Sequence, residues 1–441
     1  MRKAALHNLG CKVNSYETEA MTQLLKKAGY EIVSFQDQAD VYIINTCSVT
    51  NMADRKSRQM LHKAKKQNPN AVVVATGCYV QTATEKVAQD LSIDLVVGNN
   101  RKKDIVEILN EYYAEKEAGE QVKEEYVIDI NHTDEYEDLK ISTVTEHTRA
   151  HLKIQDGCNN FCSYCIIPYA RGRIRSRTME SIKAELERLS ASGFKEIVLT
   201  GINLSCYDDN GKKLIDVIEM ADNVNGIERI RLGSLDPEVV TEDFVERLGK
   251  VKKICPHFHF SLQSGCDKTL KAMNRHYTSD EYYEKCQLIR KYIDNPAFTT
   301  DVIVGFPGET EEDYISSREF VKKVKFAELH VFKYSKRDGT VAAKMPNQID
   351  EKIKTLRSED LIKTGEELTK EFRQAKIGQD TTVLFEEKIL LDNKEYWVGH
   401  TVDYIKIAVP EKENLEGQIR KVNVKDFLTN EIMLATRKVL Y

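Results

Sequence analysis

The chain lacks the features that mark membrane, secreted and disordered proteins. It has no run of 18 or more apolar residues, so no segment predicts a membrane-spanning helix. The first ten residues contain no apolar stretch of the kind that a signal peptide needs. Proline occupies only 8 of 441 positions while 41% of residues are hydrophobic, which excludes a largely disordered chain. We therefore expect a globular, cytoplasmic protein of about three domains, with no membrane partner.

The ten cysteines are the most informative residue type. Cytoplasmic thiols are kept reduced, so the cysteines predict core residues, metal ligands or catalysts rather than a disulfide framework. The net charge of -5 is concentrated in residues 111–138, which hold eleven acidic residues and two lysines. The rest of the chain therefore carries a net charge of +4, which is compatible with a surface that binds a polyanion.

Two long stretches alternate short apolar strands with amphipathic helices. The first, residues 1–115, predicts an α/β domain with a doubly wound parallel sheet. Residues 116–143 are interpreted as an acidic linker. The second stretch, residues 144–376, holds six expected strands, and the positions after the last five are 29 to 42 residues apart, about one strand and helix. This spacing predicts a partial (βα)6 barrel with its working residues at the carboxyl ends of the strands.

The pattern changes again in residues 377–441. Five short strands within fewer than seventy residues predict a small antiparallel β-barrel, of a kind that often binds oligonucleotides. Its aromatic side chains have two interpretations, because at strand spacing they either stack on bases or form the core of the barrel. These residues are Phe385, Tyr396, Trp397, Tyr404 and Phe427.

Three cysteines, Cys158, Cys162 and Cys165, stand in the run DGCNNFCSYC, directly after the first expected strand of the second stretch. So tight a loop brings three thiolates to one point, and thiolates select zinc or iron–sulfur clusters. No fourth cysteine follows nearby, so a four-iron cluster here would keep one iron open, as catalytic zinc sites keep a vacant position. The alternatives are a zinc site completed by a distant histidine, or three unrelated thiols.

A second set of cysteines, Cys11, Cys47 and Cys78, follows three apolar strands in the runs LGC, NTC and TGC. The carboxyl ends of parallel strands meet at one edge of a sheet, and neighbouring strands lie about 5 Å apart. The three thiols can therefore converge on one cluster. The alternative for each thiol alone is a small core residue.

The loop with three cysteines after the first strand of a partial barrel resembles the radical SAM superfamily. With the second triad and the terminal barrel, the chain as a whole resembles the methylthiotransferases, whose third domain is a TRAM-type barrel. LGCKVNSYETE at 9–19 and CIIPYARGRIRSR at 165–177 are similar to the branch that modifies N6-threonylcarbamoyladenosine in tRNA. The branches that act on isopentenyladenosine or on a ribosomal protein differ in these two stretches.

This resemblance implies two 4Fe–4S clusters and S-adenosylmethionine as cofactors. The cluster at Cys158, Cys162 and Cys165 would generate a 5′-deoxyadenosyl radical, and the other would deliver a methylated sulfur to C2 of the modified adenine next to the anticodon. The implied partners are tRNA and a small electron donor such as flavodoxin or ferredoxin. The expected contacts to S-adenosylmethionine lie after the barrel strands, at Thr200, Gly201, Asn203, Ser234, Gln263, Asp301 and Gly305.

An alternating row of arginines suggests an RNA contact. As an extended strand, Arg171, Arg173, Arg175 and Arg177 would point their guanidiniums one way, toward phosphate. The alternative is that these arginines pair with carboxylates. Two other functions remain open from the sequence alone: a methylthiotransferase that acts on a ribosomal protein, and a non-catalytic RNA-binding module that holds iron–sulfur or zinc.

Overall fold

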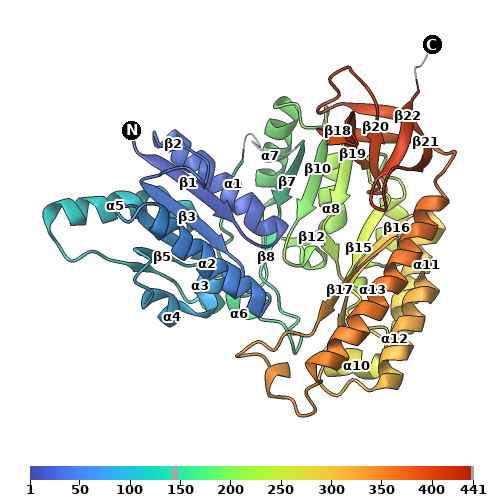
Figure 1. The fold of residues 1–441 in the computed structure, drawn as a ribbon, viewed down its shortest axis with the longest axis horizontal. Coiled ribbons are helices and arrows are strands. Elements are labelled where there is room, and N and C mark those ends of the chain that lie inside the picture. Colours follow the sequence, from blue (N-terminus) through green and yellow to red (C-terminus); the bar gives the residue numbers. More distant parts are fainter. Residues whose placement is uncertain (142–147, 439–441) are drawn as a thin grey trace.

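Figure 1 shows the computed structural model, in which the chain runs from an amino-terminal α/β unit through a larger α/β unit to a small barrel at the carboxyl terminus. The structure describes residues 1–141 and 148–438. Within those residues no helix is both long and apolar enough to cross a membrane.

The first unit is a six-stranded sheet in the order β2-β1-β3-β4-β5-β6, and every pair in it is parallel. Strands β3 and β4 are buried along their whole length, as expected for a parallel sheet with helices on both faces. Helices α1 and α5 pack on one face and α2, α3 and α4 on the other, which confirms the doubly wound sheet. The elements are β1 (Lys3–Asn8), α1 (Lys12–Lys27), β2 (Glu31–Ile32), β3 (Val41–Thr46), α2 (Asn51–Gln67), β4 (Val72–Gly77), α3 (Cys78–Thr82), α4 (Thr84–Ala88), β5 (Leu95–Val97), α5 (Ile105–Ala118) and β6 (Glu125–Tyr126).

The second unit has the six expected parallel strands, and the partial barrel is confirmed. Its third strand is interrupted at Gly233, so β13 pairs with β10 while β14 pairs with β15. The elements are β7 (Arg149–Lys153), β8 (Gln155–Asp156), α6 (Ile167–Arg171), β9 (Arg175–Ser176), α7 (Met179–Ala191), β10 (Glu196–Thr200), β11 (Asp208–Asp209), β12 (Lys212–Lys213), α8 (Leu214–Asp222), β13 (Arg229–Leu232), β14 (Ser234–Leu235), α9 (Glu242–Leu248), β15 (His257–Phe260), α10 (Asp267–Ala272), α11 (Ser279–Tyr292), β16 (Ala297–Val304), α12 (Glu311–Val324), β17 (Glu328–Lys333) and α13 (Glu351–Gln374).

The acidic segment between the two units is built into both of them. Strand β6 extends the first sheet, and farther along the chain Leu139 and Ile141 enter the hydrophobic core of the second unit. Strand pairing at one end and apolar burial at the other therefore hold the segment in place.

The third unit is a closed barrel in the order β18-β19-β20-β22-β21. The expected five-stranded barrel is confirmed, but it is not wholly antiparallel, because β20 and β22 pair in parallel. Phe385, Tyr396 and Trp397 are buried and Phe427 packs partly against the core, so the core interpretation is correct for these four. Tyr404 is not in the core, because its ring stacks on His257 of the second unit. The strands are β18 (Asp380–Leu391), β19 (Lys394–Thr401), β20 (Lys406–Val409), β21 (Ile419–Phe427) and β22 (Met433–Arg437).

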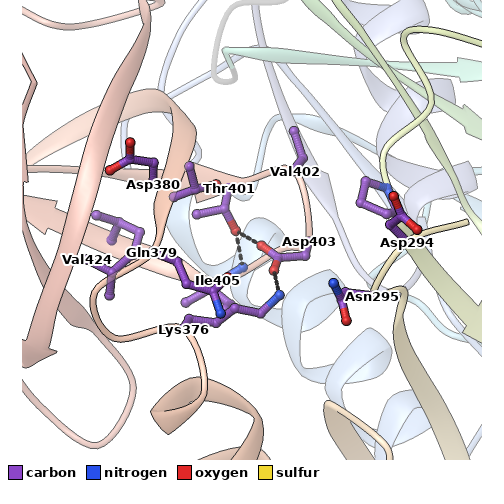
Figure 2. Close-up of a pocket in the computed structure, with 13 residues that line it drawn as sticks. Asp294, Asn295, Lys376, Gln379, Asp380, Thr401, Val402, Asp403, Ile405 and Val424 are labelled. Carbon is purple, nitrogen blue, oxygen red and sulfur yellow. Dashed lines mark hydrogen bonds and ion pairs between the residues drawn. The ribbon is translucent and has the colours of Figure 1, made fainter.

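The terminal barrel docks on the amino-terminal ends of the strands of the second unit. Arg229 and Arg231 of β13 donate hydrogen bonds to main-chain oxygens of Thr382 and Thr401, at 2.8 and 3.1 Å. Beside this contact lies a cavity of about 170 Å³, where Lys376 forms an ion pair of 2.7 Å with Asp403 (Figure 2). None of the predicted site residues lines this cavity, so we interpret it as part of the docking contact.

A buried ion-pair network joins the first two units. The Glu17 carboxylate of α1 lies 2.9 Å from Lys102, 2.7 Å from Lys153 and 2.5 Å from Arg171, and all four side chains are fully buried. Asp156 completes the network through Lys153 and Arg171, at 2.6 and 3.2 Å. Burial alone would raise the pKa of Glu17, but the three cations hold it well below its usual range.

Replacing Glu17 by Ala should destabilise the protein by about 3–5 kcal/mol, because the remaining cations stay buried without compensation. The measurement is the midpoint of thermal or urea unfolding. Glu117→Ala is the control, since Glu117 is exposed and its partner Arg2 lies 3.8 Å away, and its removal should cost less than about 1 kcal/mol. Equal and small effects of both substitutions would show that the network does not hold the two units together.

Candidate cluster sites between the first two units

The first cysteine triad lies at one edge of the amino-terminal sheet. Cys11 precedes α1, Cys47 follows β3 and Cys78 follows β4, and β1, β3 and β4 are neighbours in the sheet. A Cβ added to Gly10 would lie 2.8 Å from the Cys47 sulfur, so the loops of Cys11 and Cys47 are in contact. The predicted placement is confirmed, whereas the binding of a cluster there stays a prediction.

Polar side chains hold this edge in shape. The Asn14 amide nitrogen donates to the main-chain oxygens of Leu9 and Thr46 at 2.8 and 3.0 Å, which ties the Cys11 loop to the Cys47 strand. The Arg171 Nε lies 3.3 Å from the Cys78 sulfur and comes from the second unit. Burial raises the pKa of Cys47 to about 11, so the binding of iron must displace a proton from this thiol.

The second triad lies in the loop between β8 and α6. Cys162 is buried while Cys158 and Cys165 are partly exposed. Burial, followed by the neighbouring Cys162, raises the pKa of Cys165 to about 12. Two groups donate toward these sulfurs: the Asn160 main-chain N–H toward Cys158 at 3.5 Å, and the Arg275 guanidinium toward Cys162 at 3.3 Å. Such donors stabilise thiolates and tune the clusters that thiolates bind.

The donor sets fit iron–sulfur clusters better than single zinc ions. In a tetrahedral zinc site with bonds of about 2.3 Å, the sulfurs lie only about 3.8 Å apart. Within residues 1–141 and 148–438, neither cysteine triad forms a group whose ligand atoms all lie within 4.8 Å of one another. The wider spacing suits thiolates that bind different irons of one cluster.

Gly157 allows the loop of the second triad to close. Its φ is +73°, and an added Cβ would lie 1.8 Å from the main-chain oxygen of Arg173. The Cys158 N–H donates to the Gly172 oxygen at 3.1 Å in the same closure. A side chain at position 157 would therefore push the cysteine loop away from the segment after α6.

We expect Gly157→Ala to lose most of the iron bound at Cys158, Cys162 and Cys165, because the methyl group cannot fit against Arg173. Gly193→Ala is the matched control: its φ is +90°, but nothing lies within 4 Å of the added Cβ, so only the backbone penalty of about 1–2 kcal/mol applies. Iron and sulfide analysis of anaerobically reconstituted protein makes the comparison. Equal iron contents in the two variants would contradict the steric argument.

A cavity of about 300 Å³ lies beside the second triad, where the first two units meet. Cys165 lines it from the second unit, and Val49 and Thr50, which follow Cys47, line it from the first. Gln263 and Asp301, two of the predicted cofactor contacts, are also in its wall. Helix α3 begins at Cys78, and helix α6 follows the loop of the second triad. Figure 1 shows these two helices side by side beneath the amino-terminal sheet.

The other predicted cofactor contacts differ from one another in burial and in the side chains that they touch. Asn203 interacts with Cys158, while Thr200 is buried and Ser234 is exposed. Gly201 packs against Gln155, and an added Cβ there would come within 3.1 Å of that side chain. An added Cβ at Gly305 would lie 2.3 Å from Lys354, so packing already explains this glycine. Their roles in binding a cofactor stay predictions.

The prediction that Arg171, Arg173, Arg175 and Arg177 form one row of arginines facing phosphate is wrong. Residues 167–171 form helix α6, so the segment is not one extended strand, and only Arg173 is exposed. Arg171 is in the Glu17 network, Arg175 donates to the Arg171 oxygen at 2.9 Å, and Arg177 pairs with Glu185 at 2.6 Å. These buried guanidiniums need carboxylates or carbonyls from distant segments, which the alternating pattern does not reveal.

Two arginines beside the cysteine triads, Arg275 and Arg337, were not predicted from the sequence as part of the site. Arg275 bridges Cys162 and Asp236, with 2.7 Å to the carboxylate. Arg337 of the second unit donates to Ser48 and pairs with Asp54 of the first, at 2.8 and 2.7 Å, beside Cys47. Both arginines act through contacts that only the folded chain creates.

Known proteins match the chain along most of its length. Residues 152–321 match the Radical SAM superfamily, and residues 3–98 match the family described as Uncharacterized protein family UPF0004. The Threonylcarbamoyladenosine tRNA methylthiotransferase MtaB of Bacillus subtilis is 42% identical over 96% of this chain and 94% of its own length. The chain belongs to the radical SAM tRNA methylthiotransferases.

Further similar proteins support the same family. MtaB of Aquifex aeolicus is 40% identical over 89% of this chain and 95% of its own length. A tRNA-2-methylthio-N(6)-dimethylallyladenosine synthase of Clostridium botulinum is 36% identical over 98% and 95%. The solved structure of the radical S-adenosylmethionine methyltransferase TsrM from Kitasatospora setae shares the fold, with a TM-score of 0.57, 16% identity and 75% of each chain covered. Membership in this family makes the protein an enzyme of tRNA modification that uses S-adenosylmethionine and a 4Fe–4S cluster, rather than a non-catalytic module.

Proposed function

We propose that this methylthiotransferase inserts a methylthio group at C2 of N6-threonylcarbamoyladenosine next to the anticodon. The relatives named for threonylcarbamoyladenosine are 35–42% identical to the chain, and two of them exceed the 33–36% of those named for dimethylallyladenosine. The observation that supports the two-cluster proposal is the cavity of about 300 Å³ that is lined by Cys165 of the second triad and by Val49 and Thr50, which follow Cys47 of the first triad in the chain.

In this proposal Cys158, Cys162 and Cys165 hold the radical cluster, and a second 4Fe–4S cluster is bound by Cys11, Cys47 and Cys78. When bound, these clusters and S-adenosylmethionine would supply a carbon radical able to take a hydrogen from the unactivated C2, and the sulfur that replaces it.

The work of the protein is to position groups and to exclude water. Arg275 and Asn160 hold the thiolates of the radical site, while Arg171 does the same for Cys78. Gln263 and Asp301 line the cavity and are our proposed contacts to a cofactor or base there. Thr200, Gly201, Asn203, Ser234 and Gly305 stay proposed contacts at the other strand ends.

Arg173 is our proposed RNA contact near the site. Its guanidinium is exposed and lies 4.7 Å from the centre of the Phe161 ring, in the loop of the second triad. A small electron donor such as flavodoxin or ferredoxin and a cytoplasmic location remain parts of the proposal.

The two triads should be separable by mutation. Cys162→Ala should abolish the reductive cleavage of S-adenosylmethionine, because the radical cluster loses one of three thiolates. Cys47→Ala should keep that cleavage and lose the methylthiolated product, since its cluster lies on a separate sheet. The measurements are release of 5′-deoxyadenosine and mass analysis of tRNA nucleosides. Normal cleavage in the first variant, or product from the second, would refute the assigned roles.

Arg173→Ala should weaken tRNA binding several-fold and lower the slope of log Kd against log salt by roughly 0.7–0.9, the value of one phosphate contact. Lys322→Ala on α12 removes one positive charge from the outer face of the second unit and should leave the slope unchanged. If both variants bind tRNA with the wild-type slope, Arg173 does not contact phosphate.

A further inference from the structure

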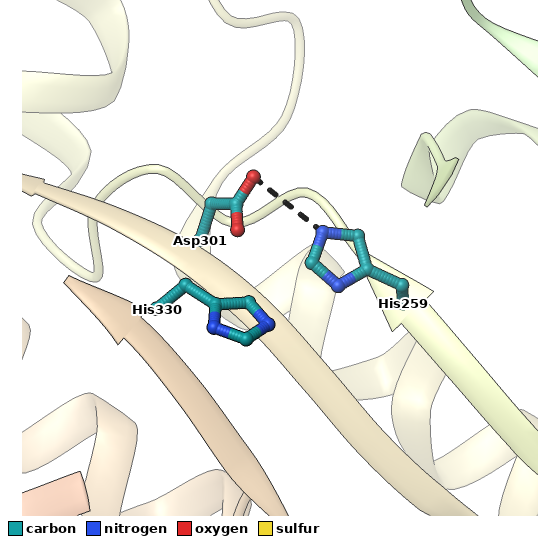
Figure 3. A group of neighbouring side chains, drawn as sticks. All are labelled: His259, Asp301 and His330. Atoms are coloured by element: carbon teal, nitrogen blue, oxygen red, sulfur yellow. Dashed lines mark ion pairs between the residues drawn. The ribbon is translucent and has the colours of Figure 1, made fainter. Parts of the chain in front are cut away.

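Three polar side chains on adjacent strands of the second unit face one another (Figure 3). His259 of β15, Asp301 of β16 and His330 of β17 have ligand atoms that all lie within 4.8 Å of one another. Across residues 1–141 and 148–438, this is the one group of three or more histidine, cysteine, aspartate or glutamate side chains with that property. It contains no cysteine, so it is separate from both triads.

Strand pairing brings the three side chains together. In the parallel ladder His259 lies opposite Thr299, and Asp301 lies opposite His330. Neighbouring strands are about 4.8 Å apart, so side chains on β15 and β17 can both reach a group on the strand between them. The carboxylate on the central strand therefore has one imidazole on each side.

The cluster is on the inner face of the partial barrel. Phe258 and Val302, which are adjacent to two of its members in the chain, belong to the hydrophobic core under the helices. Because successive side chains of a strand point to opposite faces, the cluster points the other way. His259 and Asp301 are partly exposed there, and His330 is exposed. An ion can therefore reach the three side chains from solvent.

The distance between His259 and Asp301 suits two ligands of one ion better than a direct hydrogen bond. The His259 Nε2 lies 3.5 Å from the Asp301 Oδ2, beyond the roughly 2.7–3.2 Å of an N–H···O hydrogen bond. Two ligand atoms that bind a tetrahedral ion at about 2.0–2.1 Å lie about 3.3–3.4 Å apart. An ion between these two atoms would need almost no movement of either side chain.

Thr299 holds His259 in the orientation that a metal ligand requires. Its hydroxyl oxygen lies 3.0 Å from the His259 Nδ1. Histidines that bind metals are typically fixed through the other ring nitrogen by a polar partner. Here the remaining nitrogen is Nε2, which faces Asp301. Within the part of the chain that the structure describes, no residue forms a hydrogen bond with the His330 ring, so its nitrogens are available.

Two histidines and one carboxylate are a donor set for divalent transition metals. Imidazole suits zinc, iron, nickel and copper, whereas magnesium and calcium prefer oxygen ligands. Three protein ligands leave one position of a tetrahedral ion open, as in catalytic zinc sites and unlike structural ones.

The cluster is close to the cavity of about 300 Å³. Asp301 itself lines that cavity, as do Ile303 and Phe332, which are paired in the ladder two residues farther along β16 and β17. Two residues of a strand span roughly 7 Å. A ligand on an ion at the cluster would therefore lie beside the cavity that Cys165 also lines.

We propose that His259, Asp301 and His330 bind one divalent transition metal ion, zinc being the best match, with an open position on the inner side of the partial barrel. Asp301 has two carboxylate oxygens, so one can bind the ion while the other stays available to the cavity. The proposal does not depend on the substrate of the enzyme. The competing interpretation is a plain pair of His259 and Asp301 with His330 exposed beside it.

The first test counts zinc bound to the reconstituted holoenzyme without tRNA. The protein is washed with a weak chelator, given Zn²⁺ under anaerobic conditions and desalted, and its zinc, iron and sulfide are measured. The wild type should hold one zinc per chain. Thr299→Val should weaken zinc binding about 10- to 100-fold, the range for loss of a group that supports a ligand, and His330→Ala should weaken it more.

His62→Ala is the matched control. His62 is also an exposed histidine beside a carboxylate, 2.8 Å from Asp90, but the described residues place no third such ligand next to it. This variant should bind zinc like the wild type. Since His330 and His62 are both exposed, iron and sulfide contents should be equal in these variants and the wild type, which verifies that the fold and the clusters are intact.

X-ray absorption at the zinc edge identifies the ligands of the bound ion. The expected spectrum shows nitrogen and oxygen neighbours at about 2.0–2.1 Å and no sulfur. A zinc–sulfur distance of about 2.3 Å would place the ion at a cysteine triad and overturn the inference. A wild type that retains no zinc, or a His330→Ala variant that binds zinc as tightly as the wild type, would overturn it as well.

Discussion

The carboxylate of Glu17 compensates three buried cations that come from separate parts of the chain. Charges removed from water at this depth are tolerated only when paired and hydrogen-bonded, so α1 and the first strand of the second unit must meet in one arrangement. Arg171 extends that requirement to the chemistry, since the same guanidinium reaches Cys78 at 3.3 Å. Asp156, two residues before Cys158, shares the network. The positions of both cysteine triads thus depend on one set of ion pairs.

The network also sets the electrostatics around the first triad. Lys102, Lys153 and Arg171 contribute three positive charges against the two negative charges of Glu17 and Asp156. One of these cations, Arg171, lies beside Cys78, a thiol that must lose its proton to bind iron. A buried cation near a thiolate stabilises it, so the ion pairs that join the two units also favour ligand formation.

The third unit is attached by a different kind of contact. Tyr404 stacks on His257 and His400, with ring centres 4.9 and 4.7 Å apart, while Arg231 lies over the same ring. These contacts fall at the amino-terminal ends of the strands of the partial barrel, away from the cysteine loop. The terminal barrel therefore packs against the amino-terminal end of the partial barrel without contributing a cysteine ligand.

The sequence by itself determined the strand–helix units and the positions of the six cysteines. Strands and helices have local periodicities, and parallel strands must bring their carboxyl ends to one edge, so Cys11, Cys47 and Cys78 could be placed together without coordinates. Only the tertiary structure decided which polar groups are buried. Arg171 and Arg173 have the same local pattern, yet one pairs with Glu17, 154 positions away, and the other is exposed. Arg337 and Asp54 likewise pair only because separate units fold against each other, and no local pattern encodes a contact over such a separation.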